Sequence, residues 1–218
     1  MVKGILWDMD GVLADTVEAH YQAWRAFYAE QGGAITREQL YATFGMANPE
    51  ILRLWLGNEL PEEMILALAA HKETLFRQAA KGNVKLFPGV LDWLQRARTR
   101  GYRQAVASSG EMANIVAIVS ALEIGNYFDA LVSGALLPRC KPDPAVFIQA
   151  AASLGVAPGD CLVIEDGIAG VEAARRAGIR CLAVTNTHPA DKLAGADLIV
   201  HSLAELDEAA FDRLLGED

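Results

Sequence analysis

The chain has 218 residues, of which 52% are hydrophobic and 22% are charged, a composition that fits a folded globular protein and argues against a disordered or fibrous one. The formal net charge of -9 argues against nucleic acid or an anionic membrane surface as a partner. No apolar run reaches the roughly 20 residues that span a bilayer. The opening segment MVKGILWDMD becomes acidic before it reaches the length of the apolar region of a signal peptide, so we expect no signal peptide there.

The first expected element is a buried strand over Val2–Trp7, and two carboxylates follow it at once in ILWDMDGVLADT. Asp8 and Asp10 carry like charges that repel each other, and burial penalises both charges unless a cation neutralises them. We therefore expect a cationic partner for this pair elsewhere in the chain.

No further strand is expected directly after the first one, because residues 16–84 show only helical periodicities. The segment returns through KLFPGV, where Pro88 and Gly89 mark a link. The expected helices are Val17–Gln31, Arg37–Phe44, Pro49–Gly57 and Pro61–Lys81. An insertion that leaves from the carboxyl end of the first strand lies where open α/β sheets bind ligands. We therefore predict an α-helical cap over residues 16–84.

From residue 85 onward, short apolar runs alternate with helical patterns. The runs are continuous, as in parallel strands that are covered on both faces. The expected strands are Gln104–Ala107, Ala130–Val132, Cys161–Ile164, Cys181–Val184 and Leu198–Val200, and the expected helices are Val90–Arg100, Ala113–Leu122, Pro144–Leu154 and Ile168–Ala177. This alternation predicts an α/β fold with a doubly wound parallel sheet, in which residues 1–15 and 85–218 form the catalytic core.

Polar side chains follow the expected strands of this core. Ser108 and Ser109 end the second strand, Lys141 lies in the loop after the third, and Glu165 and Asp166 end the fourth. Each one alone is typical of a helix cap, a turn or a solvated loop. Because the carboxyl ends of parallel strands share one rim, which is the usual ligand site, together they favour a functional site.

The chemistry of this set points to a phosphate ester. Carboxylates from the first and fourth strands make an all-oxygen site for a hard cation, and Mg²⁺ prefers a few carboxylates together with water and a phosphate. Lys141 and the Ser108 hydroxyl can bind the oxygens of an anion, and backbone amides around Gly11 can add a small anion nest. Asp8 is then placed to attack phosphorus, and Asp10 can donate and accept a proton.

Four segments, DMDGVLADT, ASSG, KPDP and VIEDGIAG, occur in this order and resemble the signature motifs of the haloacid dehalogenase-like superfamily. The helical insertion resembles the small cap of its beta-phosphoglucomutase-like and phosphoglycolate-phosphatase-like branch. The resemblance covers essentially the whole chain and implies a Rossmann-like core. It implies that Asp8 is the nucleophile that becomes an aspartyl phosphate and that Asp10 is the acid and base. Asp10 also argues against the dehalogenase and phosphonatase members, which lack an acid there.

The resemblance further implies how the remaining motif residues act. Ser108 and Lys141 would hold the phosphate. Independently of the resemblance, we also count Ser109 and Gly11 as phosphate-binding candidates. Mg²⁺ would be held by Asp8, the backbone carbonyl of Asp10 and Asp166, with Glu165 next to it through water.

The cap is expected to choose the substrate, and its residues are less decisive. His20 lies four residues after Thr16, so both share a helix face. Positions that resemble His20 and Lys72 couple cap closure to substrate binding in the mutase branch, although a hinge hydrogen bond and a solvated lysine are the simpler alternatives. The loop FGMANPE departs from the mutase pattern, because Phe44 and Asn48 stand where that pattern has a lysine and an arginine.

We therefore predict a Mg²⁺-dependent phosphatase of a small phosphorylated metabolite. The alternatives are a sugar-phosphate mutase on the same scaffold and a catalytically idle metabolite-binding protein, against which the intact acids, lysine and serine argue. The sequence leaves open the metabolite, the oligomeric state and the roles of His71, His188 and His201.

The three cysteines match no metal-binding spacing. Cys161 and Cys181 begin apolar runs and are expected to be buried free thiols, whereas Cys140 lies in a loop. Unpaired thiols are typical of a reducing compartment, so we expect the cytoplasm.

Overall fold

The structure, a computed structural model, describes residues 3–43, 46 and 48–216. Val2 and Phe44, which end two of the expected elements, lie outside the described residues. The chain divides into two compact units, the first made of residues 1–15 and 85–218 and the second of residues 16–84. Within the described ranges, no helix combines the length and the apolar character that crossing a bilayer requires.

The first unit is built on a parallel sheet that has six strands in the described part of the chain. The strands are β1 (Gly4–Trp7), β4 (Arg103–Ser108), β5 (Ala130–Ser133), β6 (Cys161–Glu165), β7 (Arg180–Val184) and β8 (Leu198–Val200). They lie in the order β5-β4-β1-β6-β7-β8. The predicted doubly wound sheet is confirmed, and its order reverses between β1 and β6, which is where such sheets bind ligands.

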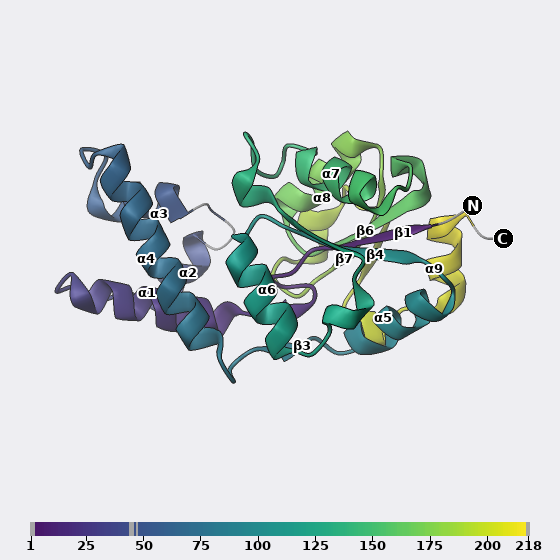
Figure 1. Cartoon of the computed structure of the whole chain (residues 1–218), viewed down its shortest axis with the longest axis horizontal. Helices are drawn as coiled ribbons and strands as arrows, with labels where there is room; N and C mark the ends of the chain where they lie inside the picture. Colours follow the sequence, from purple (N-terminus) through teal and green to yellow (C-terminus); the bar gives the residue numbers. More distant parts are fainter. Residues whose placement is uncertain (1–2, 44–45, 47, 217–218) are drawn as a thin grey trace. The chain divides into compact units, whose positions relative to one another are not determined.

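Helices cover both faces of this sheet (Figure 1). They are α5 (Val90–Thr99), α6 (Met112–Ala121), α7 (Ala145–Leu154), α8 (Ile168–Ala177) and α9 (Glu208–Leu215). On one face, Phe147 of α7 and Leu6 of β1 belong to the same apolar cluster. On the other face, Trp7 donates its indole N–H to Gln104 (3.0 Å), whose amide donates to the carbonyl of Leu94 in α5 (3.0 Å). Burial on both faces explains why these strands are apolar at successive positions.

Short 3₁₀ helices complete the first unit. They are η1 (Gly125–Tyr127), η2 (Gly134–Leu136), η3 (Pro158–Asp160), η4 (Ala190–Leu193) and η5 (Leu203–Glu205).

One feature of the first unit was not predicted. The two segments that lead to and from residues 16–84 pair with each other as short antiparallel strands, β2 (Ala14–Asp15) and β3 (Lys85–Leu86). Two-residue strands carry too little periodicity to be recognised in a sequence. The pairing joins the two ends of the inserted segment, so the insertion starts and returns at one place in the first unit.

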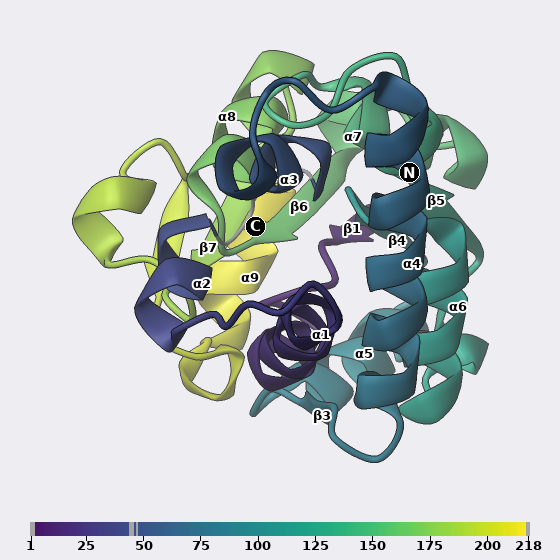
Figure 2. The same ribbon diagram turned by 90° about the vertical axis from the view of Figure 1, so that its left-hand side faces the viewer.

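The second unit is entirely helical where it is described. Its helices are α1 (Val17–Glu30), α2 (Arg37–Thr43), α3 (Asn48–Leu56) and the long α4 (Glu62–Ala80), which are labelled in Figure 2. Trp24 and Phe27 of α1, Leu52 of α3 and Ile65 of α4 pack together in an apolar core of their own. A separate core is what distinguishes a domain from a long loop.

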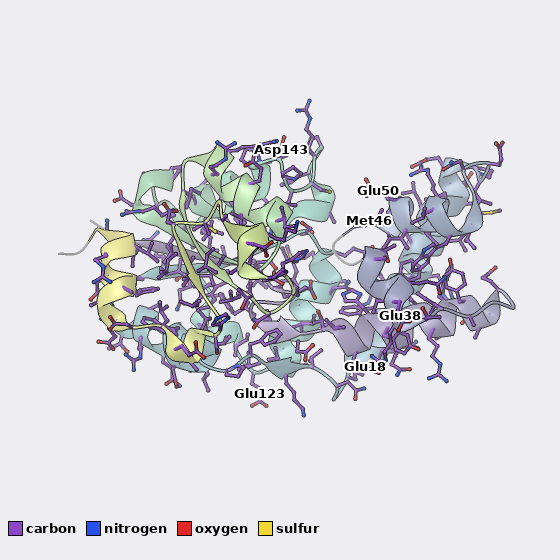
Figure 3. All side chains as sticks on the ribbon, turned by 180° about the vertical axis from the view of Figure 1, so that it is seen from behind. Glu18, Glu38, Met46, Glu50, Glu123 and Asp143 are labelled. Carbon is purple, nitrogen blue, oxygen red and sulfur yellow. The ribbon has the colours of Figure 1, made fainter. Side chains whose placement is uncertain are left out.

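Much of the acidic excess of the chain lies at its surface. The side chains of Glu38, Glu50 and Glu123 are exposed and are labelled in Figure 3. Exposed carboxylates remain hydrated and cost little, whereas a buried carboxylate needs a partner. The few acidic residues that are buried in the first unit therefore call for an explanation.

Candidate active site

Three neighbouring strands end at the centre of the sheet with polar side chains. Asp8 follows β1, Ser108 ends β4 and Glu165 ends β6, and β1 pairs with both of the other strands. The Asp8 amide donates to the carbonyl of Ile164 (3.0 Å), so the backbone of Asp8 is held by the ladder to β6. The parallel register thus brings side chains that are far apart in the sequence to one rim.

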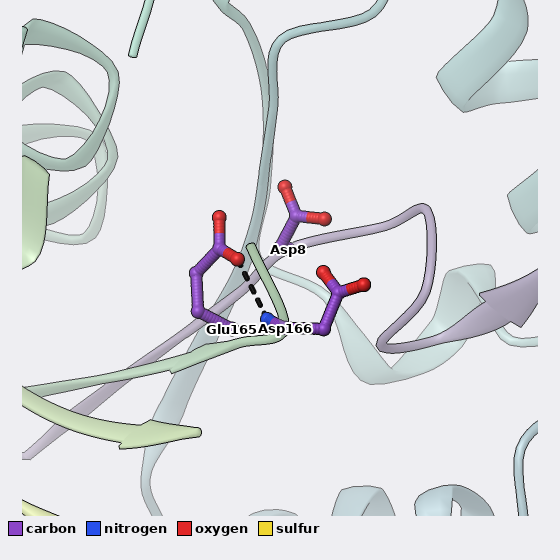
Figure 4. Close-up of side chains that lie close together, drawn as sticks. All are labelled: Asp8, Glu165 and Asp166. Carbon is purple, nitrogen blue, oxygen red and sulfur yellow. Dashed lines mark hydrogen bonds between the residues drawn. The ribbon is translucent and has the colours of Figure 1, made fainter. Parts of the chain in front are cut away.

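Three buried carboxylates meet at this rim (Figure 4). Asp8, Glu165 and Asp166 are 7%, 2% and 5% exposed, and each offers an oxygen within 4.8 Å of the others. Oε2 of Glu165 accepts hydrogen bonds from the amides of Asp166 (2.6 Å) and Gly167 (2.6 Å), which fixes its orientation. Oxygen ligands that converge in this way fit a hard divalent cation.

Lys141 is a cationic neighbour of Asp8, one of the two carboxylates for which the sequence led us to expect a cation. Its Nζ lies 2.5 Å from Oδ1 of Asp8 and 2.8 Å from Oε1 of Glu165. The ammonium also lies 4.7 Å from the centre of the Phe147 ring, which offers it an attractive π face. Lys141 therefore bridges the carboxylates of the first and fourth predicted strands.

One ammonium does not fully compensate the buried carboxylates. Burial raises the pKa of Asp8 to about 7, with a further rise from the Glu165 charge, although Lys141 acts in the opposite direction. Burial, followed by the charges of Glu165 and Asp8, also raises the pKa of Asp166 well above its usual value. For Lys141, burial lowers the pKa, but Asp8 and Glu165 outweigh it and the net shift is upward. An additional cation would relieve this repulsion, so the residues present fit a metal ion.

The loop after β1 folds tightly against this cluster. Gly11 has φ +84°, and its amide donates to the carbonyl of Ala14 (3.0 Å). A Cβ at Gly11 would lie 1.9 Å from Oδ2 of Asp166, so the turn needs glycine for both its conformation and its space. Asp10, half-buried, forms an isolated β-bridge with Ala14 in the same turn.

The loop after β4 is fixed by two serine hydroxyls. Ser108 is buried and its Oγ accepts a hydrogen bond from the Gly110 amide (3.0 Å), while Oγ of Ser133 donates to the Gly110 carbonyl (2.6 Å). Oγ of Ser108 is the acceptor in its contact with the Gly110 amide, so the hydroxyl proton of Ser108 can still be donated to a ligand. Ser109, the neighbouring phosphate-binding candidate, has an exposed side chain.

Sequence reasoning missed the contribution of β7 to this rim. Thr187 donates its hydroxyl to Oδ2 of Asp166 (2.5 Å), and Asn186 donates its amide to the Gly11 carbonyl (2.7 Å). The signal was present, because the polar run TNTH directly follows the buried strand CLAV. Nδ1 of His188, left unassigned above, lies 2.9 Å from Oγ1 of Thr187.

The other two unassigned histidines also have neighbours. Nε2 of His71 lies 2.6 Å from a carboxylate oxygen of Glu30, and Nδ1 of His201 lies 3.0 Å from Oγ1 of Thr185. Both contacts are exposed, so they assign no role to either ring.

Gly170 was also missed, and it leads to a test. An added Cβ would lie 1.6 Å from Oε1 of Glu165, whose carboxylate is held by Lys141 and two amides. We expect Gly170→Ala to lower the free energy of unfolding by about 1–3 kcal/mol, because overpacking of this size exceeds the roughly 0.5–1 kcal/mol that alanine gains in a helix. Denaturant unfolding measures the difference.

Gly159→Ala is the matched control, because a Cβ at Gly159 meets nothing within 4 Å. If the two variants unfold at the same denaturant concentration, Glu165 is not held in the position described.

The candidate cap residues all belong to the second unit, and three of them cluster there. Nζ of Lys72 lies 3.0 Å from Nδ1 of His20 and 2.8 Å from Oε1 of Glu73, and Asn48 also donates its amide to Oε1 of Glu73. Thr16 is fully buried. Glu73 was not predicted, although its place on the buried stripe of α4 beside Ala69 and Phe76 was readable in the sequence.

Comparison with known proteins matches residues 5–184 to a family model described as haloacid dehalogenase-like hydrolase. Beta-phosphoglucomutase of Bacillus subtilis (strain 168) is 29% identical over 214 residues, which cover 94% of this chain and 92% of that protein. Validoxylamine A 7'-phosphate phosphatase of Streptomyces hygroscopicus subsp. limoneus is 28% identical over 217 residues, which cover 94% of this chain and 96% of that protein. A crystal structure of a CbbY mutant from Rhodobacter sphaeroides in complex with xylulose-(1,5)bisphosphate has a TM-score of 0.86 at 28% identity, and covers 96% of this chain and 99% of that chain.

Proposed function

This chain belongs to the haloacid dehalogenase-like hydrolase family, and we propose that it is a phosphatase that acts on a small phosphorylated metabolite. The observation that carries the proposal is the position of Asp8, a buried carboxylate at the centre of the sheet that Lys141 contacts at 2.5 Å. A nucleophile beside a cation that can bind the attacked anion is the arrangement that phosphoryl transfer needs. The relatives named above support a phosphate ester as the substrate.

The proposed reaction has two steps. The Asp8 carboxylate attacks phosphorus and the bond to the ester oxygen breaks, while Asp10 donates a proton to the leaving alcohol. Asp10 then accepts a proton from the water that attacks the aspartyl phosphate, which releases inorganic phosphate and restores Asp8. Lys141 and the hydroxyl of Ser108, with the amides near Gly11 and Ser109, would bind the phosphoryl oxygens throughout.

We propose Mg²⁺ as the metal of this site. Asp8, Asp166 and the backbone carbonyl of Asp10 would hold it, with Glu165 next to it, and the buried all-oxygen donor set supports this choice. Bound there, Mg²⁺ would neutralise charge on the carboxylates and polarise the phosphoryl group. Thr187 would orient Asp166 through its 2.5 Å hydrogen bond.

A sugar-phosphate mutase is the main alternative, because beta-phosphoglucomutase is among the relatives. A mutase must grip a bisphosphate and hold its second phosphate away from the nucleophile, which needs a cation such as arginine. The polar cluster of the second unit pairs Lys72 with Glu73 and offers Asn48 as an amide. A lysine that is already paired with a carboxylate is a weak site for a second phosphate, so the cluster supports hydrolysis over isomerisation.

We expect that beta-glucose 1-phosphate, supplied with glucose 1,6-bisphosphate, will yield inorganic phosphate or no product, but not glucose 6-phosphate. A coupled assay for glucose 6-phosphate, run beside a phosphate-release screen of phosphorylated metabolites, makes the comparison. Glucose 6-phosphate formed without phosphate release, faster than any monoester is hydrolysed, would establish the mutase instead.

The remaining alternative is a binding protein without turnover. Steady release of phosphate from an aryl phosphate would separate an enzyme from such a protein. If no phosphorylated compound in the screen releases phosphate when Mg²⁺ is present, the proposed function is overturned.

We also propose a cytoplasmic location. All three cysteines are free thiols, two of them, Cys161 and Cys181, buried and one, Cys140, exposed. Free thiols are typical of a reducing compartment.

A further inference from the structure

The second unit contains a buried cluster of charged and polar side chains. Lys72 and Glu73, adjacent on α4, have side chains that are 1% and 6% exposed and form an ion pair of 2.8 Å. The Lys72 ammonium lies 5.2 Å and 5.3 Å from the ring centres of Trp24 and Phe76. Well-packed apolar side chains usually stabilise such a position as well as a buried ion pair does. A role in recognition accounts for the charges better than stability does.

The hydrogen bonds define the charge of this cluster. A lysine ammonium can only donate, so Nδ1 of His20, 3.0 Å from Nζ of Lys72, must accept, and the imidazole is neutral. The His20 ring stacks on Phe76 with 4.1 Å between the ring centres, which fixes its orientation. Asn48 is uncharged and donates its amide to Glu73. Among the contacts described, these four polar side chains therefore sum to no net charge, because Glu73 cancels Lys72.

A neutral cluster that contains a carboxylate discriminates between two kinds of substrate. A second phosphate or a carboxylate on the substrate would gain no net attraction here, because the charge of Glu73 offsets that of Lys72, and the cost of removing the anion from water would stay uncompensated. A hydroxyl group can donate to the Glu73 carboxylate and accept from the Asn48 amide or from Lys72. The cluster favours an uncharged, hydroxyl-bearing group over an anionic one.

We propose that Glu73, held by Lys72 and Asn48, is a specificity-determining residue that restricts this enzyme to monophosphates whose other end carries hydroxyl groups. The proposal rests on the proposed phosphatase function and on the expectation that the helical segment, residues 16–84, chooses the substrate. A preference for monophosphates would distinguish this chain from the related CbbY protein, a mutant of which was crystallised with a bisphosphate.

The test compares matched substrates that differ by one phosphate, glucose 6-phosphate with glucose 1,6-bisphosphate and fructose 1-phosphate with fructose 1,6-bisphosphate. The wild type should hydrolyse the monophosphate with the higher kcat/KM. Glu73→Gln keeps the shape of the side chain and raises the charge of the cluster by one unit. We expect it to shift the ratio of kcat/KM toward the bisphosphate by about tenfold or more, mainly through a lower KM for the bisphosphate.

Asn48→Lys raises the same charge from a different helix, so it should shift the ratio in the same direction even if Glu73→Gln folds poorly. The control is Glu63→Gln, because Glu63 is exposed and lies on α4, the helix that carries Glu73. This variant should leave the ratio of kcat/KM unchanged. Phosphate release by the wild type with the same ratio in Glu73→Gln and Asn48→Lys would overturn this inference alone. No phosphate release from any phosphorylated compound would overturn the proposed function, and this inference with it.

Discussion

Asp8→Asn is expected to lower kcat for phosphate release by roughly three orders of magnitude or more. The amide has nearly the shape of the carboxylate but lacks the negative charge that attacks phosphorus, and it is a poorer ligand for a cation. The substitution also removes one of the two carboxylates that contact Lys141, so the ammonium keeps only Glu165 as an acidic partner among the contacts described. Steady-state kinetics with the best substrate of the screen gives the value.

Asp92→Asn serves as the control, because Asp92 is exposed on α5 and the same chemical change there should leave kcat within experimental error. Near-native thermal unfolding of Asp8→Asn would show that its loss of activity is not a loss of folding. A folded Asp8→Asn enzyme that keeps even a tenth of wild-type turnover would rule out Asp8 as the nucleophile.

Removal of divalent cations is expected to abolish turnover, and Mg²⁺ is expected to restore it. The three carboxylates Asp8, Glu165 and Asp166 lie within 4.8 Å of one another, and burial raises the pKa of Asp8 to about 7, so the site is short of positive charge. Ca²⁺ should inhibit, because its larger and looser coordination places the phosphoryl group less accurately against Asp8. Activity after EDTA treatment and after titration with each cation measures both effects.

Asp166→Ala should weaken activation by Mg²⁺ and lower kcat, whereas Asp92→Ala should change neither. Full turnover in EDTA, or an Asp166→Ala enzyme with the wild-type response to Mg²⁺, would refute the metal assignment.

Most of the core fold could be predicted because its signals are local. A run such as CLVI in β6 is apolar at successive positions, which identifies a strand buried on both faces. Gly155 and Gly178 follow two of the expected helices and end them in the left-handed conformation, which glycine adopts readily. The rule that parallel strands end at one rim then led to Asp8, Lys141 and Glu165. The structure places Lys141 within hydrogen-bonding distance of both Asp8 and Glu165, while the catalytic roles of the three residues stay predictions.

The remainder of the site depends on contacts between distant segments. Nothing local distinguishes Gly170 from other helix glycines, and its importance lies in the Glu165 carboxylate that would occupy the space of a Cβ. Thr187 could have been found by applying the strand-end rule to β7, but its contact with Asp166 needs coordinates. The same holds for Glu73, whose partner Asn48 lies 25 positions away in the sequence.

The most direct test of the covalent mechanism is to look for phosphate on Asp8 during turnover. The wild-type enzyme is mixed with its best substrate, quenched in acid within the first turnover, digested and analysed by mass spectrometry. We expect one phosphoryl group on the peptide that contains Asp8, lost on treatment with hydroxylamine as an acyl phosphate should be, and absent from Asp8→Asn. Rapid phosphate release with an unmodified Asp8 peptide at every quench time, or a hydroxylamine-stable phosphate on Ser108, would contradict the mechanism.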